Sequence, residues 1–164
     1  MSASTNLERI GNGNSVGSIL TGQHRSIIQS VGATRTLLPE ESGAICLLDK
    51  ADGQTWTLPT PAEGMVFEFA TTVAVSGGTI KVVTATPASQ FILGSVFTYT
   101  IATASGAGFA FNGTTHVSIA MQTGGTYGGL VGTRFKLEAI SATQWVISGS
   151  LVGSGTIVTP AATS

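Results

Sequence analysis

Three short apolar runs between residues 37 and 69 constrain this chain most, because turn signals between them leave no room for a helix. The runs cover residues 44–48, 55–58 and 65–69. The Asp52-Gly53 pair between the first two runs favours a tight turn with positive φ. Pro59, Pro61 and Gly64 separate the second run from the third, and proline denies a donor to any sheet ladder. The stretch therefore predicts a β-meander, in which consecutive strands pair side by side.

The rest of the chain continues in short alternating segments. Apolar residues recur at every second position in 65–75, 79–84, 91–101, 114–121 and 134–140, and residues 144–148 are expected to pair back on the last of these as a hairpin. About eight or nine strands at this spacing, with no sustained helical period, are typical of sandwiches and barrels. We predict an all-β protein: an extended N-terminal arm (1–36), a β-sandwich or jelly-roll-like domain (37–150) and a C-terminal tail (151–164).

The composition indicates a surface that is covered by partners. Only 9% of the 164 residues are charged and 42% are hydrophobic, whereas about 25% charged residues is usual for soluble domains. The net charge of −1 and the scattered basic residues argue against nucleic-acid binding. Cys46 is the one cysteine, so an intrachain disulfide is excluded and a buried thiol is expected.

The first 22 residues combine Ser, Asn and Gly with isolated apolar residues and follow no regular period. Such a segment is either a flexible tail or an arm that docks on another surface. The isolated leucines, isoleucines and valine favour the docking arm. No apolar run reaches the roughly 18 residues that a membrane-spanning helix needs, and the N-terminus has no signal-peptide pattern. We expect no membrane association and no secretion by that route.

No constellation of catalytic, cofactor-binding or metal-binding residues is recognisable. His24 and His116 are the only histidines, and they lie far apart in the sequence. The glycine-rich stretch 122–132 lacks the phosphate-loop signature. A hydrolase would have to use Glu40, Glu41 and Glu63, of which the first two would point to opposite faces of an extended backbone. The sequence predicts that the protein is not an enzyme.

The central stretch carries a resemblance to a known family. The pattern comprises Leu38, Glu41, Ser42, Gly43, Leu47, Leu48, Asp49, Gly53, Thr57, Leu58, Pro59, Pro61, Gly64, Phe67 and Phe69. It resembles the opening of a family of tailed-bacteriophage virion proteins, found as capsid decoration (cement) and head-fibre proteins. The segment from Trp145 to Gly149 also looks like the closing hairpin of those domains. The similarity covers 37–69 and 134–149, and the middle of the chain only in character.

The resemblance implies a β-sandwich that forms a homotrimer over local threefold axes of an icosahedral head and clamps the major capsid protein on the outer surface of the virion. It implies no catalytic residues and no cofactor. The expected capsid-contact residues are Leu7, Arg9, Ile10, Val16, Ile19, Leu20, Arg25, Ile27, Ile28 and Arg35, the arginines pairing with capsid carboxylates. The alternative is a tail-fibre or receptor-binding module in which exposed aromatic residues, Trp56 and Tyr127, stack on sugars.

Overall fold

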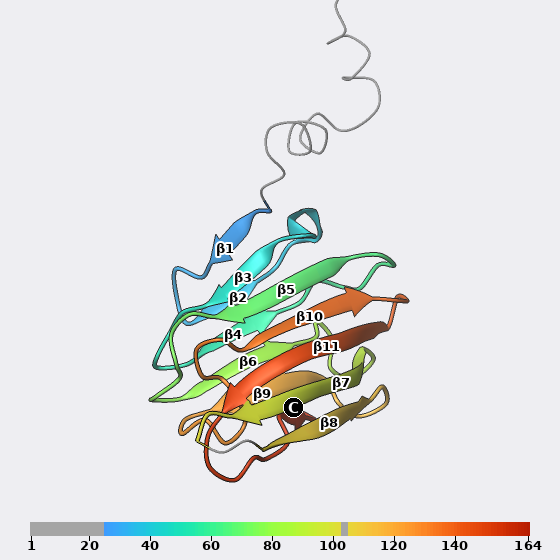
Figure 1. Ribbon diagram of the computed structural model, residues 1–164. Coiled ribbons are helices and arrows are strands. Elements are labelled where there is room, and N and C mark those ends of the chain that lie inside the picture. Colours follow the sequence, from blue (N-terminus) through green and yellow to red (C-terminus); the bar gives the residue numbers. More distant parts are fainter. Residues whose placement is uncertain (1–24, 103–104) are drawn as a thin grey trace, which may run out of the picture.

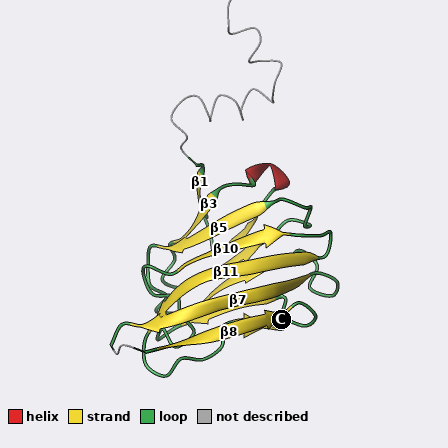
Figure 2. Ribbon diagram, turned by 45° about the vertical axis from the view of Figure 1, so that its right-hand side comes forward, coloured by secondary structure: helices red, strands yellow, loops and turns green. Residues whose placement is uncertain are grey.

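The protein is an all-β sandwich of two mixed sheets, as the sequence predicts (Figure 1). The computed structural model describes residues 25–102 and 105–164. The larger sheet, sheet A, has the order β1-β3-β5-β10-β11-β7-β8, and sheet B has the order β12-β9-β6-β4-β2. Figure 2 shows the strands of sheet A side by side from β1 to β8. The single helical segment of the described residues is a 3₁₀ turn at Pro39–Glu41.

The strand bounds are β1 (Ile27–Gln29), β2 (Thr34–Thr36), β3 (Ile45–Leu48), β4 (Gln54–Thr57), β5 (Val66–Thr71), β6 (Thr79–Val83), β7 (Phe91–Thr100), β8 (Gly106–Asn112), β9 (Ser118–Gln122), β10 (Arg134–Ala139), β11 (Gln144–Gly153) and β12 (Ala161–Ala162). The predicted β10–β11 hairpin is confirmed, with Phe135, Leu137 and Ala139 turned to the core.

The predicted meander is wrong. Strand β3 belongs to sheet A, where it pairs in parallel with β1 and β5, and β4 belongs to sheet B, where it pairs in parallel with β2 and β6. Gly53 has the expected positive φ of 92°, but its turn carries the chain from one sheet to the other. Alternating burial looks the same whether two strands lie side by side or face each other across a core, so the pattern alone does not distinguish the two arrangements.

The first half of the chain therefore winds between the two layers. Strands β1 to β6 alternate between sheet A and sheet B, and each strand from β3 to β6 pairs in parallel with the strand two places earlier. The later strands close the sandwich: β7 pairs with β8, β9 pairs with β6, and the β10–β11 hairpin lies between β5 and β7.

Aromatic side chains from both sheets fill the core. Phe69 of β5 stacks on Phe135 of β10 with ring centroids 5.1 Å apart, and Phe67 packs against Trp145 at 6.1 Å. Trp56 of sheet B meets the edge of Phe69 from the opposite layer. The two tryptophans and Phe67 and Phe69 are fully buried. These contacts explain why the alternation in β4, β5 and β10 is strict.

Both predicted domain boundaries shift. Strands β1 and β2 lie within the segment assigned to the arm, and each is hydrogen-bonded into a sheet. At the other end, β11 extends to Gly153 and β12 pairs with β9, so part of the predicted tail belongs to the sandwich. Three-residue and two-residue strands are too short to show an alternation, and only their neighbours in the sheet define them.

Candidate docking surfaces

Four of the predicted capsid-contact residues lie along one edge of the sandwich, which we call the arm edge: residues 25–41, which include β1, β2 and the 3₁₀ turn. Arg25, Ile27, Ile28 and Arg35 belong to it, and residue 25 is where the described chain begins (Figure 1). Ile27 is 65% exposed, whereas Ile28 packs against the core. The other six, Leu7, Arg9, Ile10, Val16, Ile19 and Leu20, lie outside the described residues.

Arg25 is held by the sandwich itself. Its guanidinium pairs with Glu68 of β5, and its Nε donates to the carbonyl oxygen of Gly43 at 2.8 Å. Arg134 of β10 pairs with the same carboxylate from the other side. Hydrogen bonds from Arg134, and then from Arg25, hold the pKa of Glu68 below its ordinary value, and Glu68 in turn raises the pKa of Arg134. This cluster ties the first described residue to the outer face of sheet A.

Arg35 is also partnered within the chain. Its guanidinium pairs with Glu41 and lies 5.9 Å from the centre of the Trp56 ring. Glu41 additionally accepts a hydrogen bond from the backbone N–H of Leu38 at 2.9 Å, which closes the 3₁₀ turn. A role of Arg25 or Arg35 in pairing with capsid carboxylates would therefore require an exchange of partners.

The arm edge exposes apolar side chains beside these ion pairs. Val31 is 100% exposed and Leu38 is 56% exposed. An open hollow of about 360 Å³ lies next to Val31 and is lined by residues 31–33, 49–53 and Val73. Sequence reasoning did not single out Val31 or Leu38 as contact residues. The sequence did contain a signal for their exposure, because Val31 precedes Gly32 and Leu38 precedes Pro39, where a turn is expected.

The opposite edge of the molecule carries no charge, and we call it the neutral edge: β7, β8 and β12. None of the 52 residues from 82 to 133 is Lys, Arg, Asp or Glu. Phe97, Tyr99 and Ile101 project from the outer face there, 41%, 55% and 70% exposed, and the first two rings lie 4.7 Å apart. The alternation in residues 91–101 predicts that these three share a face, but it does not predict that this face points away from the core.

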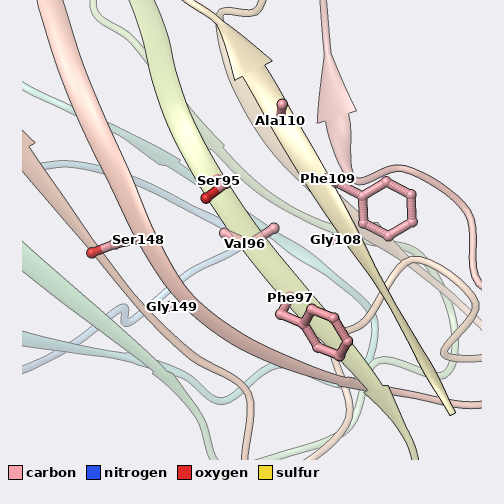
Figure 3. Close-up of a pocket in the computed structure, with 8 residues that line it drawn as sticks. All are labelled: Ser95, Val96, Phe97, Gly108, Phe109, Ala110, Ser148 and Gly149. Atoms are coloured by element: carbon pink, nitrogen blue, oxygen red, sulfur yellow. The ribbon is translucent and has the colours of Figure 1, made fainter.

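A shallow hollow lies beside Phe97 on the same face. It has a volume of about 480 Å³ and spans β7, β8 and β11, and Figure 3 shows the small side chains Ser95, Ala110 and Ser148 around it. Glycine and serine at these positions leave much of the sheet backbone uncovered. The hollow holds no charged or titratable side chain, so it suits an apolar or hydrogen-bonding contact rather than acid–base chemistry.

The two aromatic residues proposed for sugar stacking, Trp56 and Tyr127, are less exposed than that role requires. Trp56 is fully buried in the core, so the expectation that it is an exposed stacking platform is wrong. Tyr127 lies half-buried in the 122–132 loop. The aromatic rings that the neutral edge exposes are those of Phe97 and Tyr99.

The titratable residues that the structure describes form no catalytic arrangement that we can identify. Residues 25–102 and 105–164 contain no group of three His, Cys, Asp or Glu side chains placed to hold a metal ion. His116 accepts a hydrogen bond from the backbone N–H of Asn112 at 3.1 Å, while His24 lies outside the described residues. Cys46 is fully buried, and burial raises the pKa of its thiol to about 12. Glu41, one of the carboxylates considered for a hydrolase, pairs with Arg35.

Within the part of the chain that the structure covers, no helix has the length and apolar character needed to cross a membrane. Comparisons with protein-family models, curated proteins and solved structures returned no match for this chain.

Proposed function

We propose that this protein is a structural virion protein that decorates and stabilises the capsid of a tailed bacteriophage, acting as a trimer on the major capsid protein at threefold positions of the outer surface. The support is the motif of residues 37–69 together with a nearly uncharged sandwich. The observation that carries the proposal furthest is that the first described residue, Arg25, lies at the arm edge, where Ile27, Val31 and Leu38 expose apolar side chains.

The stabilisation follows from mass action. A protein that binds the assembled shell, but not its free subunits, shifts the equilibrium toward the shell. Each stable contact would bury about 1,000 Å² or more. The sequence of residues 1–24 contains dispersed apolar residues with only Glu8 and Arg9 charged. Ile27 and Leu38 expose further apolar side chains on the sandwich. Arg25 and Arg35 already pair within the chain, so Arg9, which lies outside the described residues, is the favoured candidate for pairing with a capsid carboxylate.

The experiment compares binding to undecorated phage heads by co-sedimentation. Deletion of residues 1–22, and replacement of Leu7, Ile10, Ile19 and Leu20 by serine at constant length, should each abolish binding. The folded state should remain, because the described strands of the sandwich begin only at Ile27. Val131→Ser, which changes an exposed valine away from the arm edge, is the matched control and should bind normally. Full binding by the deletion variant would overturn the proposal.

The tail-fibre alternative keeps one specific observation in its favour: the adjacent exposed rings of Phe97 and Tyr99 beside the hollow of the neutral edge. The electron-rich face of an exposed aromatic ring attracts the C–H groups of a sugar, and the Phe97 and Tyr99 rings, tilted at 51° to each other, offer two such faces. Glycan binding by the isolated protein that is lost in Tyr99→Ala, with no binding to heads, would favour this reading over capsid decoration.

A further inference from the structure

Strand β8 ends sheet A with a row of backbone groups that point away from the sheet. The N–H of Thr100 donates to Ser105, and the N–H of Gly113 donates to Ile92. Both bonds join an even-numbered residue of the β7 side to an odd-numbered residue of the β8 side. Hydrogen-bonded pairs alternate along an antiparallel ladder, so in the register of β7 and β8 the odd-numbered residues of β8 direct their N–H and C=O groups at β7. The even-numbered residues therefore direct theirs outward.

Three outward-facing residues, Gly106, Gly108 and Ala110, lack a neighbouring strand among the described residues, because β8 is the last strand of its sheet. The next even-numbered residue, Asn112, confirms the direction, since its N–H donates to His116 Nδ1 on that side. The three side chains are two hydrogens and a methyl group, so no side chain of these residues shields the backbone.

Natural edge strands are usually protected by lysine, proline, a bulge or a short length. Strand β8 has seven residues, none of which is charged or proline. The other edge of sheet A is β1, which has three residues and lies beside Arg25. Of the two edges, β8 is the one suited to receive another strand.

We propose that β8 pairs antiparallel with β8 of a second copy of this chain about a two-fold axis at Gly108, so that the two copies of sheet A become one continuous sheet. In this register Gly108 faces its own counterpart, and Gly106 faces Ala110 of the second copy. Each of these pairs exchanges two N–H···O bonds, because the outward-facing groups are those of a hydrogen-bonded pair. The contact is isologous: the same surface is used on both copies.

The Phe97 ring explains why the partner is a second copy rather than an unrelated strand. A Cβ atom at Gly106 would lie 2.4 Å from Phe97 Cε1, and one at Gly108 would lie 3.7 Å from Phe97 Cδ2. The ring thus lies across the outer face of β8. Adjacent strands are about 4.8 Å apart, so the two Phe97 rings would come side by side across the axis and cover each other.

Charge supports the same partner. The neutral edge has no charged side chain to attract or repel an occupant, so a charged strand would lose hydration there without gaining an ion pair. A second copy brings an equally uncharged strand, the same small residues and a matching aromatic ring. It satisfies the backbone groups and covers the exposed apolar rings together.

This pairing does not depend on the proposed function. A two-fold contact cannot close a trimer, so in a trimeric protein it would join two trimers, and in a monomeric protein it would form a dimer. Breaking the contact halves the mass of a dimer, and likewise that of a closed pair of trimers. Loss of head binding, which tests capsid decoration, is a separate measurement.

The first test is the solution mass, by light scattering, of the full chain and of Ala110→Pro. Proline at residue 110 removes the N–H that points away from the sheet. The hydrogen bonds to β7 are made by the neighbouring residues 109 and 111, so they are kept. The mass should halve in Ala110→Pro and stay unchanged in Ala110→Ser, which keeps the N–H. An equal mass for Ala110→Pro and the unchanged protein would overturn the proposal, provided that circular dichroism shows both folded.

The second test uses a disulfide at the axis. Hydrogen-bonded antiparallel partners have Cα atoms about 5.5 Å apart, within the range that a disulfide spans. Gly108→Cys should cross-link to a covalent dimer on mild oxidation, whereas Gln29→Cys on the opposite edge strand should not. Cys46 is fully buried and does not compete. Equal cross-linking of the two variants, or binding of a peptide of residues 1–24 at β8 without self-association, would overturn the proposal.

Discussion

Trp56 and Phe69 meet edge to face across the sandwich, with ring centroids 6.0 Å apart and planes at 80°. Their strands, β4 and β5, are consecutive in the chain but belong to different sheets. Both rings are fully buried. This contact joins sheet B to the centre of sheet A. It also accounts for the role of Trp56, which is structural.

Trp56→Ala should lower the free energy of unfolding by about 3–5 kcal/mol, because it removes a large buried ring and leaves a cavity between the sheets. Urea denaturation followed by circular dichroism measures the change. Tyr127→Ala is the control, since Tyr127 lies half-buried in a loop and should cost far less. Equal losses for the two variants would contradict the assignment of Trp56 to the core.

Glu68→Gln should reduce the loss of folding stability that occurs as the pH is lowered below about 4.5. The pKa of Glu68 in the folded protein is held below its ordinary 4.5 by Arg134 and Arg25. Its stabilising contribution is therefore complete above about pH 4.5 and is lost as the pH falls through the lower folded-state pKa. Urea midpoints measured from pH 7 downward test this.

The control for that series is Glu63→Gln. Glu63 is exposed and has no ion-pair partner among the described residues, so its replacement should shift the profile little. A Glu68→Gln profile that runs parallel to that of the unchanged protein would show that the Arg25–Glu68–Arg134 cluster does not contribute to acid sensitivity.

Gly94→Ala should be strongly destabilising, by about 1–3 kcal/mol or more from backbone strain alone. Gly94 has a φ of 113°, and an added Cβ would lie 2.3 Å from the carbonyl oxygen of Ile147 in β11. Gly32→Ala is the matched control: it has no positive φ and nothing within 4 Å of an added Cβ. Thermal melting should separate the two, and equal melting temperatures would contradict the close approach of β7 and β11.

Cys46 should resist thiol reagents in the native protein. The side chain is fully buried and the pKa of its thiol is raised to about 12, while the thiolate is the reactive form. Labelling with an aromatic disulfide reagent should be slow at pH 8 and rapid in urea. Rapid labelling of the native protein would indicate that the sandwich opens readily at β3.

Much of the fold was predictable because its inward-facing residues alternate strictly. Phe67 and Phe69, Ile119 and Met121, and the inward-facing residues of the β10–β11 hairpin are buried as expected. Sheet membership was not predictable in the same way. A glycine turn such as that at Gly53 reverses a chain within a sheet or carries it across a core equally well, and long-range packing decides between the two.

The candidate surfaces were predictable in part. The charge-free segment 82–133 was visible in the sequence, but both faces of β7 carry apolar or small residues, so the alternation did not reveal which face is exposed. The prediction for Trp56 was wrong for a related reason. An aromatic residue in a half-buried strand can face the core or the solvent, and packing against strands distant in the sequence decides which face is buried.

The position of the β10–β11 hairpin has a consequence for synthesis. The hairpin lies between β5 and β7, yet it is made after both. Until residues 134–153 leave the ribosome, sheet A lacks the two strands that join β1-β3-β5 to β7-β8, so the facing edges of these two parts are without their native partners. A chain in which residues 134–153 are not yet made thus has two parts of sheet A with unpaired edges. Shortening the chain before β11 should yield an insoluble product rather than a smaller folded protein, because the missing strands are central rather than terminal.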